Sequence, residues 1–228
     1  LTGRRADLLE SLAAEVHGRA ISADLSRPEE AERLARDAEP VDILVANAGV
    51  QGGGDLRSFD AESVDTVLNV NLRAPIVLAQ TLMAGMAERG RGQIVFMSSL
   101  SGKVTTPRTA LYNATKFGLR GFAHALRADL RPAGVGVSVI CPGFIREAGM
   151  FAKSGVKLPP GVGTSSPGDV ARAVVRAIER NRAEIDVAPL PMRLSAAFGG
   201  LAPETAATIT RISGGDRIGE QLAGAHRP

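Results

Sequence analysis

Apolar positions along the chain follow two spacings that alternate from one end to the other. The first spacing is helical, and it predicts helices over residues 6–17, 27–38, 60–89, 109–131 and 167–181. Between them lie short apolar runs, which read "RAISADLS", "PVDILVANAG", "GQIVFMSS", "GVGVSVICPG" and "AEIDVAP". Continuous apolar runs of this length are typical of strands buried on both faces of a parallel sheet. The alternation predicts βαβ units in a doubly wound α/β fold, with a mostly parallel sheet flanked by helices on both faces.

The pattern predicts one domain without a linker or an internal repeat. We expect residues 1–190 to form it and residues 191–228 to add a helical C-terminal extension. That tail has three readings: a cap on the core, an oligomer contact or, less well supported by its charge, a helix on a membrane surface. The loop over 144–166 is rich in Gly, Pro and Ser and follows the carboxyl end of a strand, where such folds bind ligands. It is a candidate lid over a substrate.

Composition narrows the class of protein. The 228 residues are 44% hydrophobic, which is enough for one packed core, and no signal-peptide pattern or uninterrupted apolar run of about 20 residues is visible. A net charge of +3, with arginines interleaved with acids and few aromatic residues, argues against a nucleic-acid surface. The single Cys141 fits a reducing compartment, so we expect a cytoplasmic protein. The three histidines, at positions 17, 124 and 226, lack partners at ligand spacing, so we expect no metal site.

The residue with the clearest chemistry is Tyr112, the only tyrosine of the chain. Lys116, one of only four lysines, follows it by one helical turn, so both side chains share a helix face. An ammonium group beside a phenol favours the phenolate and lowers its pKa, and such a tyrosine can act as a general acid or base. The pair alone also fits an amphipathic helix in which the two residues are neighbours by chance.

Two further residues and one segment favour a catalytic role for this pair over a chance neighbourhood. Ser99 ends a predicted strand thirteen residues before Tyr112, at the sheet edge where ligands bind. Asn71 lies in a long helix four residues before Pro75, which has no N–H for the Asn71 carbonyl, so we expect a kink and an acceptor free to hold a water molecule. The "ANAG" segment after a buried strand has small residues that let a flat ligand approach the backbone. Separately, these features also fit a turn serine, a proline kink and an ordinary turn.

Together, these residues resemble the short-chain dehydrogenase/reductase family, and the resemblance runs from Leu1 to about residue 190. It implies a Rossmann-type fold in which Tyr112 gives or takes the proton on a carbonyl or alcohol oxygen. Ser99 would hydrogen-bond that oxygen, and Lys116 would lower the tyrosine pKa and hold the nicotinamide ribose. The Asn71 carbonyl would position a water molecule that connects the lysine to solvent.

The resemblance also implies a nicotinamide cofactor. The residues expected to bind it, besides the tyrosine and the lysine, are Arg4, Asp24, Asn47, Ala48, Gly49, Pro142, Gly143 and Ile145. Arg4 stands where members that prefer NAD carry an acid, and an arginine there suits a 2′-phosphate, so we expect NADP(H), with NAD as the alternative. Arg4 and Arg5 also fit exposed loop charges, and Asp24 also fits a helix-entry cap.

Two features depart from the family pattern. Glu147 stands where a threonine usually helps to hold the cofactor, and its charge would oppose the phosphates. The sequence also opens at what resembles the end of the family's second strand, so the first strand and its glycine-rich turn are missing. The glycine-rich segments 49–55 and 213–220 lack the strand-to-helix setting that turn needs. We expect about 35 residues upstream, and without them a hole in the sheet beside its switch point.

These observations predict an NADP(H)-dependent carbonyl reductase or alcohol dehydrogenase that acts on a small carbonyl or alcohol substrate. One alternative is a non-catalytic binding or structural relative that kept the fold and lost its cofactor. Another is an epimerase or dehydratase with the same Tyr–Lys pair, although such relatives usually carry longer C-terminal substrate domains. The resemblance implies a homodimer or homotetramer formed through the two long helices at 60–89 and 109–131.

Overall fold

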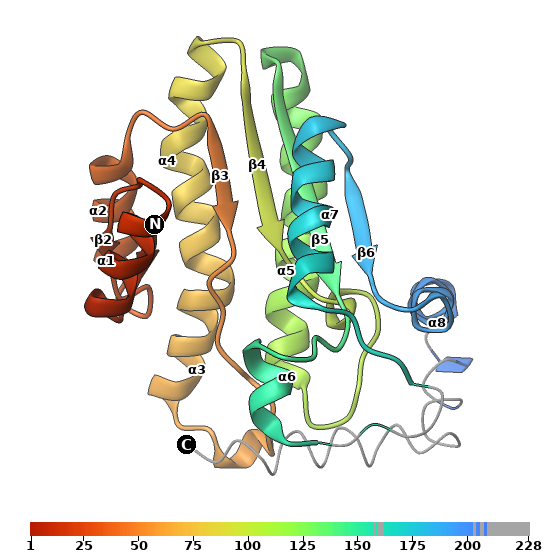
Figure 1. The fold of residues 1–228 in the computed structure, drawn as a ribbon. Coiled ribbons are helices and arrows are strands. Elements are labelled where there is room, and N and C mark those ends of the chain that lie inside the picture. The colour runs from red at the N-terminus through yellow and green to blue at the C-terminus, as the bar shows by residue number, and fades with distance from the viewer. Residues whose placement is uncertain (157, 159–161, 203, 206–207, 209–228) are drawn as a thin grey trace.

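A computed structural model describes residues 1–156, 158, 162–202, 204–205 and 208 (Figure 1). In chain order, its elements are β1 (Thr2–Gly3), α1 (Ala6–Glu15), β2 (Ile21–Ser22), α2 (Pro28–Ala38), β3 (Ile43–Ala46), η1 (Leu56–Ser58), α3 (Ala61–Leu68), η2 (Asn69–Arg73), α4 (Ala74–Glu88), β4 (Gly92–Met97), η3 (Leu100–Gly102), α5 (Ala110–Leu130), η4 (Arg131–Ala133), β5 (Val135–Pro142), α6 (Gly149–Ser154), α7 (Pro167–Glu179), β6 (Glu184–Val187) and α8 (Leu190–Leu201). Strands and helices alternate as the apolar pattern predicts.

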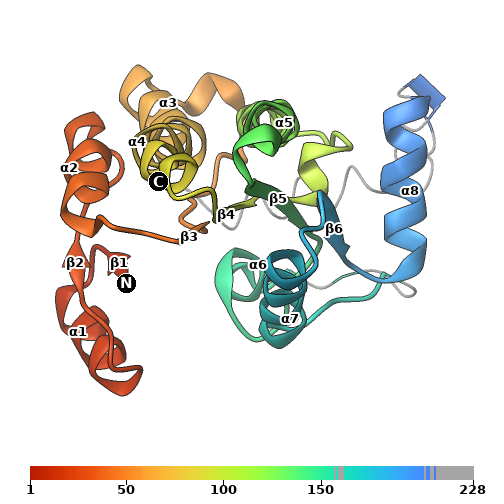
Figure 2. The same ribbon diagram turned by 90° about the horizontal axis from the view of Figure 1, so that it is seen from above.

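All paired strands run parallel. β3, β4, β5 and β6 form one sheet in that order, and β1 and β2 form a separate pair. Figure 2 shows α4 and α5 on one face of the larger sheet and α6 and α7 on the other. The doubly wound α/β architecture is therefore confirmed.

Two hydrophobic clusters hold the layers together. Between the sheet and the helices α4 and α5, Phe96, Met86 and Leu119 are fully buried. On the other face, Val95 and Ile140 pack against Ala173 and Ala177 of α7. Burial of each large side chain contributes roughly 1.5–3 kcal/mol, so β4 and β5, which are buried on both faces, form the centre of the core.

The sheet is interrupted between β1 and β3, where the predicted hole lies (Figure 2). β3 was expected to be buried on both faces, and that expectation is wrong. Val45 stays 41% exposed although its register partner Val95 on β4 is fully buried, and Ile43 on the same face of β3 is also exposed. The reason is that α7 covers this face over β4 and β5, and the described residues place no helix over it at β3.

The predicted helix over 60–89 runs from Ala61 to Glu88. Its turn at Asn69–Arg73 is a π-helix, so the chain accommodates Pro75 by widening the helix just before it. By length and composition this helix could cross a membrane, although no uninterrupted apolar run in it is that long. Its apolar residues have another explanation in this fold, because Leu78, Ala79, Leu82 and Met86 of α4 are buried in the core.

Other boundaries differ from expectation by a few residues. The run expected as a strand at "RAISADLS" forms only the two-residue β2. The candidate lid over 144–166 contains α6, whereas residues 157 and 159–161 lie outside the described part. Of the C-terminal tail, α8 is helical as expected, and the glycine-rich segment 213–220 lies outside the described residues.

Candidate active site

Ser99 stands two residues after the carboxyl end of β4. Its side chain caps the short helix η3 by accepting a hydrogen bond from Ser101 N, with 3.1 Å between the atoms. Its hydroxyl donates to the carbonyl oxygen of Pro142, at the end of the neighbouring strand β5, over 3.3 Å. These contacts hold the hydroxyl at the carboxyl edge of the sheet.

Tyr112 lies in the first turn of α5. The loop between η3 and α5 is tied to this turn by Asn113, whose side-chain amide donates to the carbonyl oxygens of Ser101 and Val104 at 2.6 and 3.0 Å. Ser98 strengthens the same junction, because its hydroxyl donates to the carbonyl oxygen of Lys116 at 2.9 Å. These contacts hold the η3 turn that begins at Ser99 against the first turns of α5, which carry Tyr112 and Lys116.

Lys116 is buried, with 3% of its surface exposed. Its ammonium nitrogen lies 5.6 Å from the centroid of the Tyr112 ring and donates a hydrogen bond to Met97 O at 2.9 Å. Burial lowers the pKa of Lys116 to about 8, because the charged form loses its hydration.

The expected effect of this lysine on the tyrosine is wrong for this structure. The pKa of Tyr112 lies above its ordinary value of 10, because burial of the phenol disfavours the phenolate. A hydrogen bond with the Ser99 side chain acts in the opposite direction and is outweighed. Tyr112 is therefore protonated at neutral pH, which suits a proton donor.

Asn71 is fully buried in the π-helical turn. Its side chain makes a reciprocal pair with the backbone of Val50, accepting from Val50 N at 2.7 Å and donating to Val50 O at 2.9 Å. It also donates to the Thr115 hydroxyl at 3.4 Å. The asparagine thus fixes the segment after Gly49 against α5, which is a reason for this residue type that the sequence did not reveal. Its own carbonyl cannot accept from Pro75, which lacks an N–H.

The predicted cofactor residues follow the carboxyl ends of β1, β2 and β3. Arg4 directly follows β1, and Asp24 lies two residues after the adjacent strand β2. The pKa of Asp24 is lowered by its hydrogen bonds with Ser26 and, to a smaller extent, by the charge of Arg4. Asp24 does not cap α2. It accepts hydrogen bonds from the backbone and hydroxyl of Ser26, and Arg27 is the residue before that helix.

Asn47, Ala48 and Gly49 follow β3, and the first two are exposed. A side chain at Gly49 would approach Asn71 Oδ1 to 3.4 Å, Lys116 Nζ to 3.8 Å and the Met150 methyl group of α6 to 3.3 Å. A side chain at Gly49 would therefore crowd the Met150 methyl group and come close to the lysine ammonium.

The segment after β5 carries the other predicted cofactor residues. Pro142 ends β5, Gly143 donates to Val187 O at 3.0 Å, and Ile145 pairs with Ser165. Glu147 has a left-handed backbone, with φ 74°, and its exposed carboxylate pairs with Arg146 at 2.8 Å. The glutamate thus points its charge to its neighbour, and the loop turns at the position where the family usually has a threonine.

Comparison with known proteins shows the family of this chain. Residues 1–157 match the family model described as short chain dehydrogenase. The chain belongs to the short-chain dehydrogenase/reductase family. A ketoacyl reductase, HetN of Nostoc sp., is 33% identical over 204 residues, which cover 86% of this chain and 71% of HetN. Dehydrogenase/reductase SDR family member 7B of Xenopus laevis is 31% identical over 191 residues, covering 79% of this chain and 59% of that protein. The chain is thus an oxidoreductase of this family and spans less than two thirds of the second relative.

A solved structure gives the same result for the fold. A metagenomic short-chain oxidoreductase in complex with NADP is 28% identical and superposes with a TM-score of 0.67 over 82% of this chain and 83% of that one. The parallel sheet flanked by helices is therefore the Rossmann-type fold of these dehydrogenases.

The described residues provide groups for some parts of a nicotinamide dinucleotide and not for others. The Lys116 ammonium donates one of its three N–H bonds to Met97 O, and the others suit the hydroxyl groups of a ribose. Arg4 at the end of β1 suits a phosphate. The described residues contain no glycine-rich strand-to-helix turn for the diphosphate, and the sheet is interrupted at that place.

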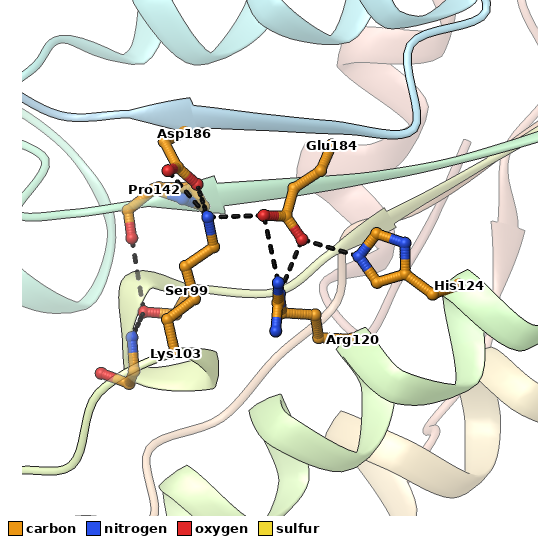
Figure 3. A network of polar contacts seen from close by, with 8 residues as sticks. Ser99, Lys103, Arg120, His124, Pro142, Glu184 and Asp186 are labelled. Atoms are coloured by element: carbon orange, nitrogen blue, oxygen red, sulfur yellow. Dashed lines mark hydrogen bonds and ion pairs between the residues drawn. The ribbon is translucent and has the colours of Figure 1, made fainter. Parts of the chain in front are cut away.

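Sequence reasoning missed a charged network beside the site (Figure 3). Lys103, at the end of η3, bonds the carboxylates of Asp186 and Glu184 on β6, and Glu184 also binds Arg120 and His124 of α5. The partners lie 60 to 83 residues apart in the chain, so spacing gives no signal for them. Cys141, Glu184 and Asp186 could group as metal ligands, but the Lys103 ammonium already bonds both carboxylates.

Proposed function

We propose that this dehydrogenase reduces a small carbonyl compound with NADPH, or runs the reverse oxidation, with Tyr112 as its general acid or base. The observation that carries this proposal is the meeting of Ser99, Tyr112 and Lys116 at the carboxyl edge of the sheet. HetN is a ketoacyl reductase, which supports a carbonyl substrate, and the NADP complex of the metagenomic relative supports the cofactor.

Each of the three residues has one task in the proposed reaction. The Ser99 hydroxyl orients the substrate oxygen, and Tyr112 donates the proton to it. Because burial raises the Tyr112 pKa, the phenol is protonated at neutral pH and can act as the proton donor. The nicotinamide ring, when bound, supplies the hydride.

Lys116 and Asn71 serve the cofactor and the proton supply in this proposal. A buried ammonium with free N–H bonds can hold the ribose hydroxyls, and a pKa of about 8 lets Lys116 exchange its proton near neutral pH. The Asn71 carbonyl, which Pro75 cannot engage, is the acceptor for a water molecule that returns the proton.

Further residues hold the remaining parts of the cofactor. Asn47, Ala48 and Gly49 border the ribose and nicotinamide side, Pro142, Gly143 and Ile145 line the ring, and Asp24 borders the adenine. Arg4 favours NADP(H) over NAD(H), because a guanidinium pairs well with a phosphate. We also propose pairing of chains into a homodimer or homotetramer through the helix over 61–88 and α5.

Tyr112→Phe tests the function directly. The natural protein, with any residues that precede Leu1 retained, is mixed with NADPH and a panel of ketones, and NADPH oxidation is followed by absorbance. We expect the variant to bind NADPH as the wild type does and to lose turnover by roughly a hundredfold or more, since it lacks the proton donor. Retained turnover would exclude Tyr112 from the chemistry.

Ser99→Ala provides a second test with a matched control. We expect it to lower turnover about tenfold to a hundredfold, because one donor to the substrate oxygen is lost. Ser101→Ala removes a neighbouring hydroxyl of the same turn and leaves its backbone N–H contact with Ser99, so turnover stays near the wild-type value.

A second candidate function is a non-catalytic binding protein. It is favoured by Glu147, whose exposed carboxylate stands where the family usually has a threonine that helps to hold the cofactor. Equilibrium dialysis with NADPH and NADH separates the two, because a protein that binds neither dinucleotide has no dehydrogenase activity of this kind.

A further inference from the structure

Glu184 joins two elements that carry candidate catalytic groups. Its carboxylate on β6 lies 2.5 Å from Lys103 Nζ, 2.6 Å from Arg120 Nε and 2.7 Å from His124 Nε2. Figure 3 shows the carboxylate between the lysine of η3 and the two side chains of α5. Its side chain is 18% exposed, so these contacts are partly shielded from water.

The partners of Glu184 connect it to both sides of the site. Lys103 ends the η3 turn that begins at Ser99. Arg120 lies one helical turn after Lys116 on α5, the helix that also carries Tyr112. A single carboxylate thus bonds the turn of the serine and the helix of the tyrosine.

The charges around Glu184 are balanced. Asp186 on the same strand shares the Lys103 ammonium, whose nitrogen lies 2.6 and 2.7 Å from its two oxygens. Lys103 and Arg120 therefore face two carboxylates, and the neutral Cys141 thiol of β5 lies beside them. These cations, with His124, hold the pKa of Glu184 down to about 2, although burial alone would raise it.

Stability alone is a weak explanation for such a network. Partly buried ion pairs cost desolvation, and well-packed apolar residues often replace them without loss. What ion pairs supply is a fixed geometry, because each charge is left uncompensated if its partner moves. Here the geometry they fix is that of η3 relative to α5.

We propose that Glu184 is a positioning residue that holds the Ser99 turn and the Tyr112 helix at the separation at which the two hydroxyl groups can hydrogen-bond. The effect of Glu184 on catalysis rests on the function proposed above. Its effect on the contact between Ser99 and Tyr112 does not, and the test measures that contact without turnover.

The test uses the single tyrosine of the chain. Replacement of tyrosine by 3-fluorotyrosine during expression labels Tyr112 alone, and the ¹⁹F shift against pH gives the ionisation midpoint of its phenol. In the wild type, the Ser99 hydrogen bond lowers this midpoint. We expect Glu184→Gln to raise it, because the serine moves away from the phenol.

The sign of the shift discriminates between explanations. Loss of one negative charge near Lys103 and Arg120 would by itself favour the phenolate and lower the midpoint. Ser99→Ala should raise the midpoint as Glu184→Gln does, and the double variant should raise it no further, because both act through one hydrogen bond. A midpoint that stays or falls in Glu184→Gln, or two shifts that add, would overturn the proposal.

Two further variants serve as a charge control and as a substitute for Glu184→Gln. Glu179→Gln removes an exposed carboxylate of α7 and should leave the midpoint unchanged. Arg120→Gln removes one of the two contacts of Glu184 with α5 and leaves the one with His124. Loss of this cation would by itself raise the midpoint, so if Glu184→Gln does not fold, the double variant of Arg120→Gln with Ser99→Ala decides: shifts that add would overturn the proposal.

Kinetics add a readout that depends on the proposed function. We expect Glu184→Gln to lower kcat about tenfold, with the KM for NADPH within about twofold of the wild type, since a small displacement of catalytic groups affects the chemical step. A wild type without NADPH turnover contradicts the proposed function, and the ¹⁹F midpoints then still decide whether Glu184 positions Ser99.

Discussion

The backbone N–H of Tyr112 donates a hydrogen bond to the carbonyl oxygen of Gly52, with 3.3 Å between the nitrogen and the oxygen. A Cβ at Gly52 would lie 2.8 Å from Val67 Cγ1 and 3.1 Å from Tyr112 N. A Cβ at Gly53 would keep 3.5 Å to its nearest neighbour, Arg108 O. A side chain at Gly52 would therefore clash with Val67 and the start of α5, whereas one at Gly53 would fit.

Gly52→Ala should displace the first turn of α5 and with it the phenol of Tyr112. We expect a loss of turnover of about tenfold to a hundredfold and a loss of roughly 1–3 kcal/mol in the free energy of unfolding, because the added methyl group overpacks the contact. Gly53→Ala is the matched control and should retain both values. Steady-state kinetics and urea unfolding measure them, and equal effects of the two variants would contradict the argument.

Arg4 and Arg5 give a matched pair for cofactor preference. Arg4 is proposed to hold the 2′-phosphate, whereas Arg5 precedes α1 without a cofactor role. We expect Arg4→Ala to raise the KM for NADPH about tenfold to a hundredfold, the effect of losing one charge-assisted contact, and to leave the KM for NADH nearly unchanged. Arg5→Ala should change neither constant. An equal rise in the KM values for NADPH and NADH would show that Arg4 does not bind the 2′-phosphate.

The sequence predicts those parts of the molecule that depend on local pattern. The apolar runs of β4 and β5 predict buried parallel strands because both faces of these strands are covered. The spacing of Tyr112 and Lys116 predicts a shared face because helical geometry decides it. The same reasoning fails for β3, whose exposure at Val45 depends on which helix covers the sheet there.

Features that depend on tertiary contacts escaped prediction. The Lys103–Asp186 bond joins residues 83 positions apart, which no local pattern records. The direction of the Tyr112 pKa shift was missed for a related reason. The sequence showed the lysine that favours the phenolate, but the burial that raises the phenol pKa exists only in the folded chain.

The stability of the fold should depend on pH through Glu184. Its pKa is about 2 in the folded protein against an ordinary value of 4.5, so the ionised carboxylate stabilises the fold above pH 4.5. That contribution, at most on the order of 3 kcal/mol by linkage and reduced by solvent screening of the part-exposed partners, is lost as the pH falls from 4.5 toward 2. Urea unfolding of wild type and Glu184→Gln between pH 3 and pH 7 should show a difference that shrinks with acidity. A difference independent of pH would mean that the ionised group contributes nothing, and Glu179→Gln should match the wild type throughout.

We expect Pro75 to destabilise its helix and to keep the Asn71 carbonyl free for a water molecule in the proton path. It follows the π-helical turn at Asn69–Arg73 and offers no N–H to the Asn71 carbonyl. Pro75→Ala restores that donor, so we expect the helix to close onto the carbonyl and the unfolding temperature to rise by about 2–4 °C for a gain near 1 kcal/mol. Turnover should fall about tenfold, because the carbonyl no longer accepts from the water molecule that returns protons to Lys116. Circular dichroism and NADPH oxidation measure the two effects. A more stable variant with unchanged turnover would remove the Asn71 carbonyl from the proposed proton path.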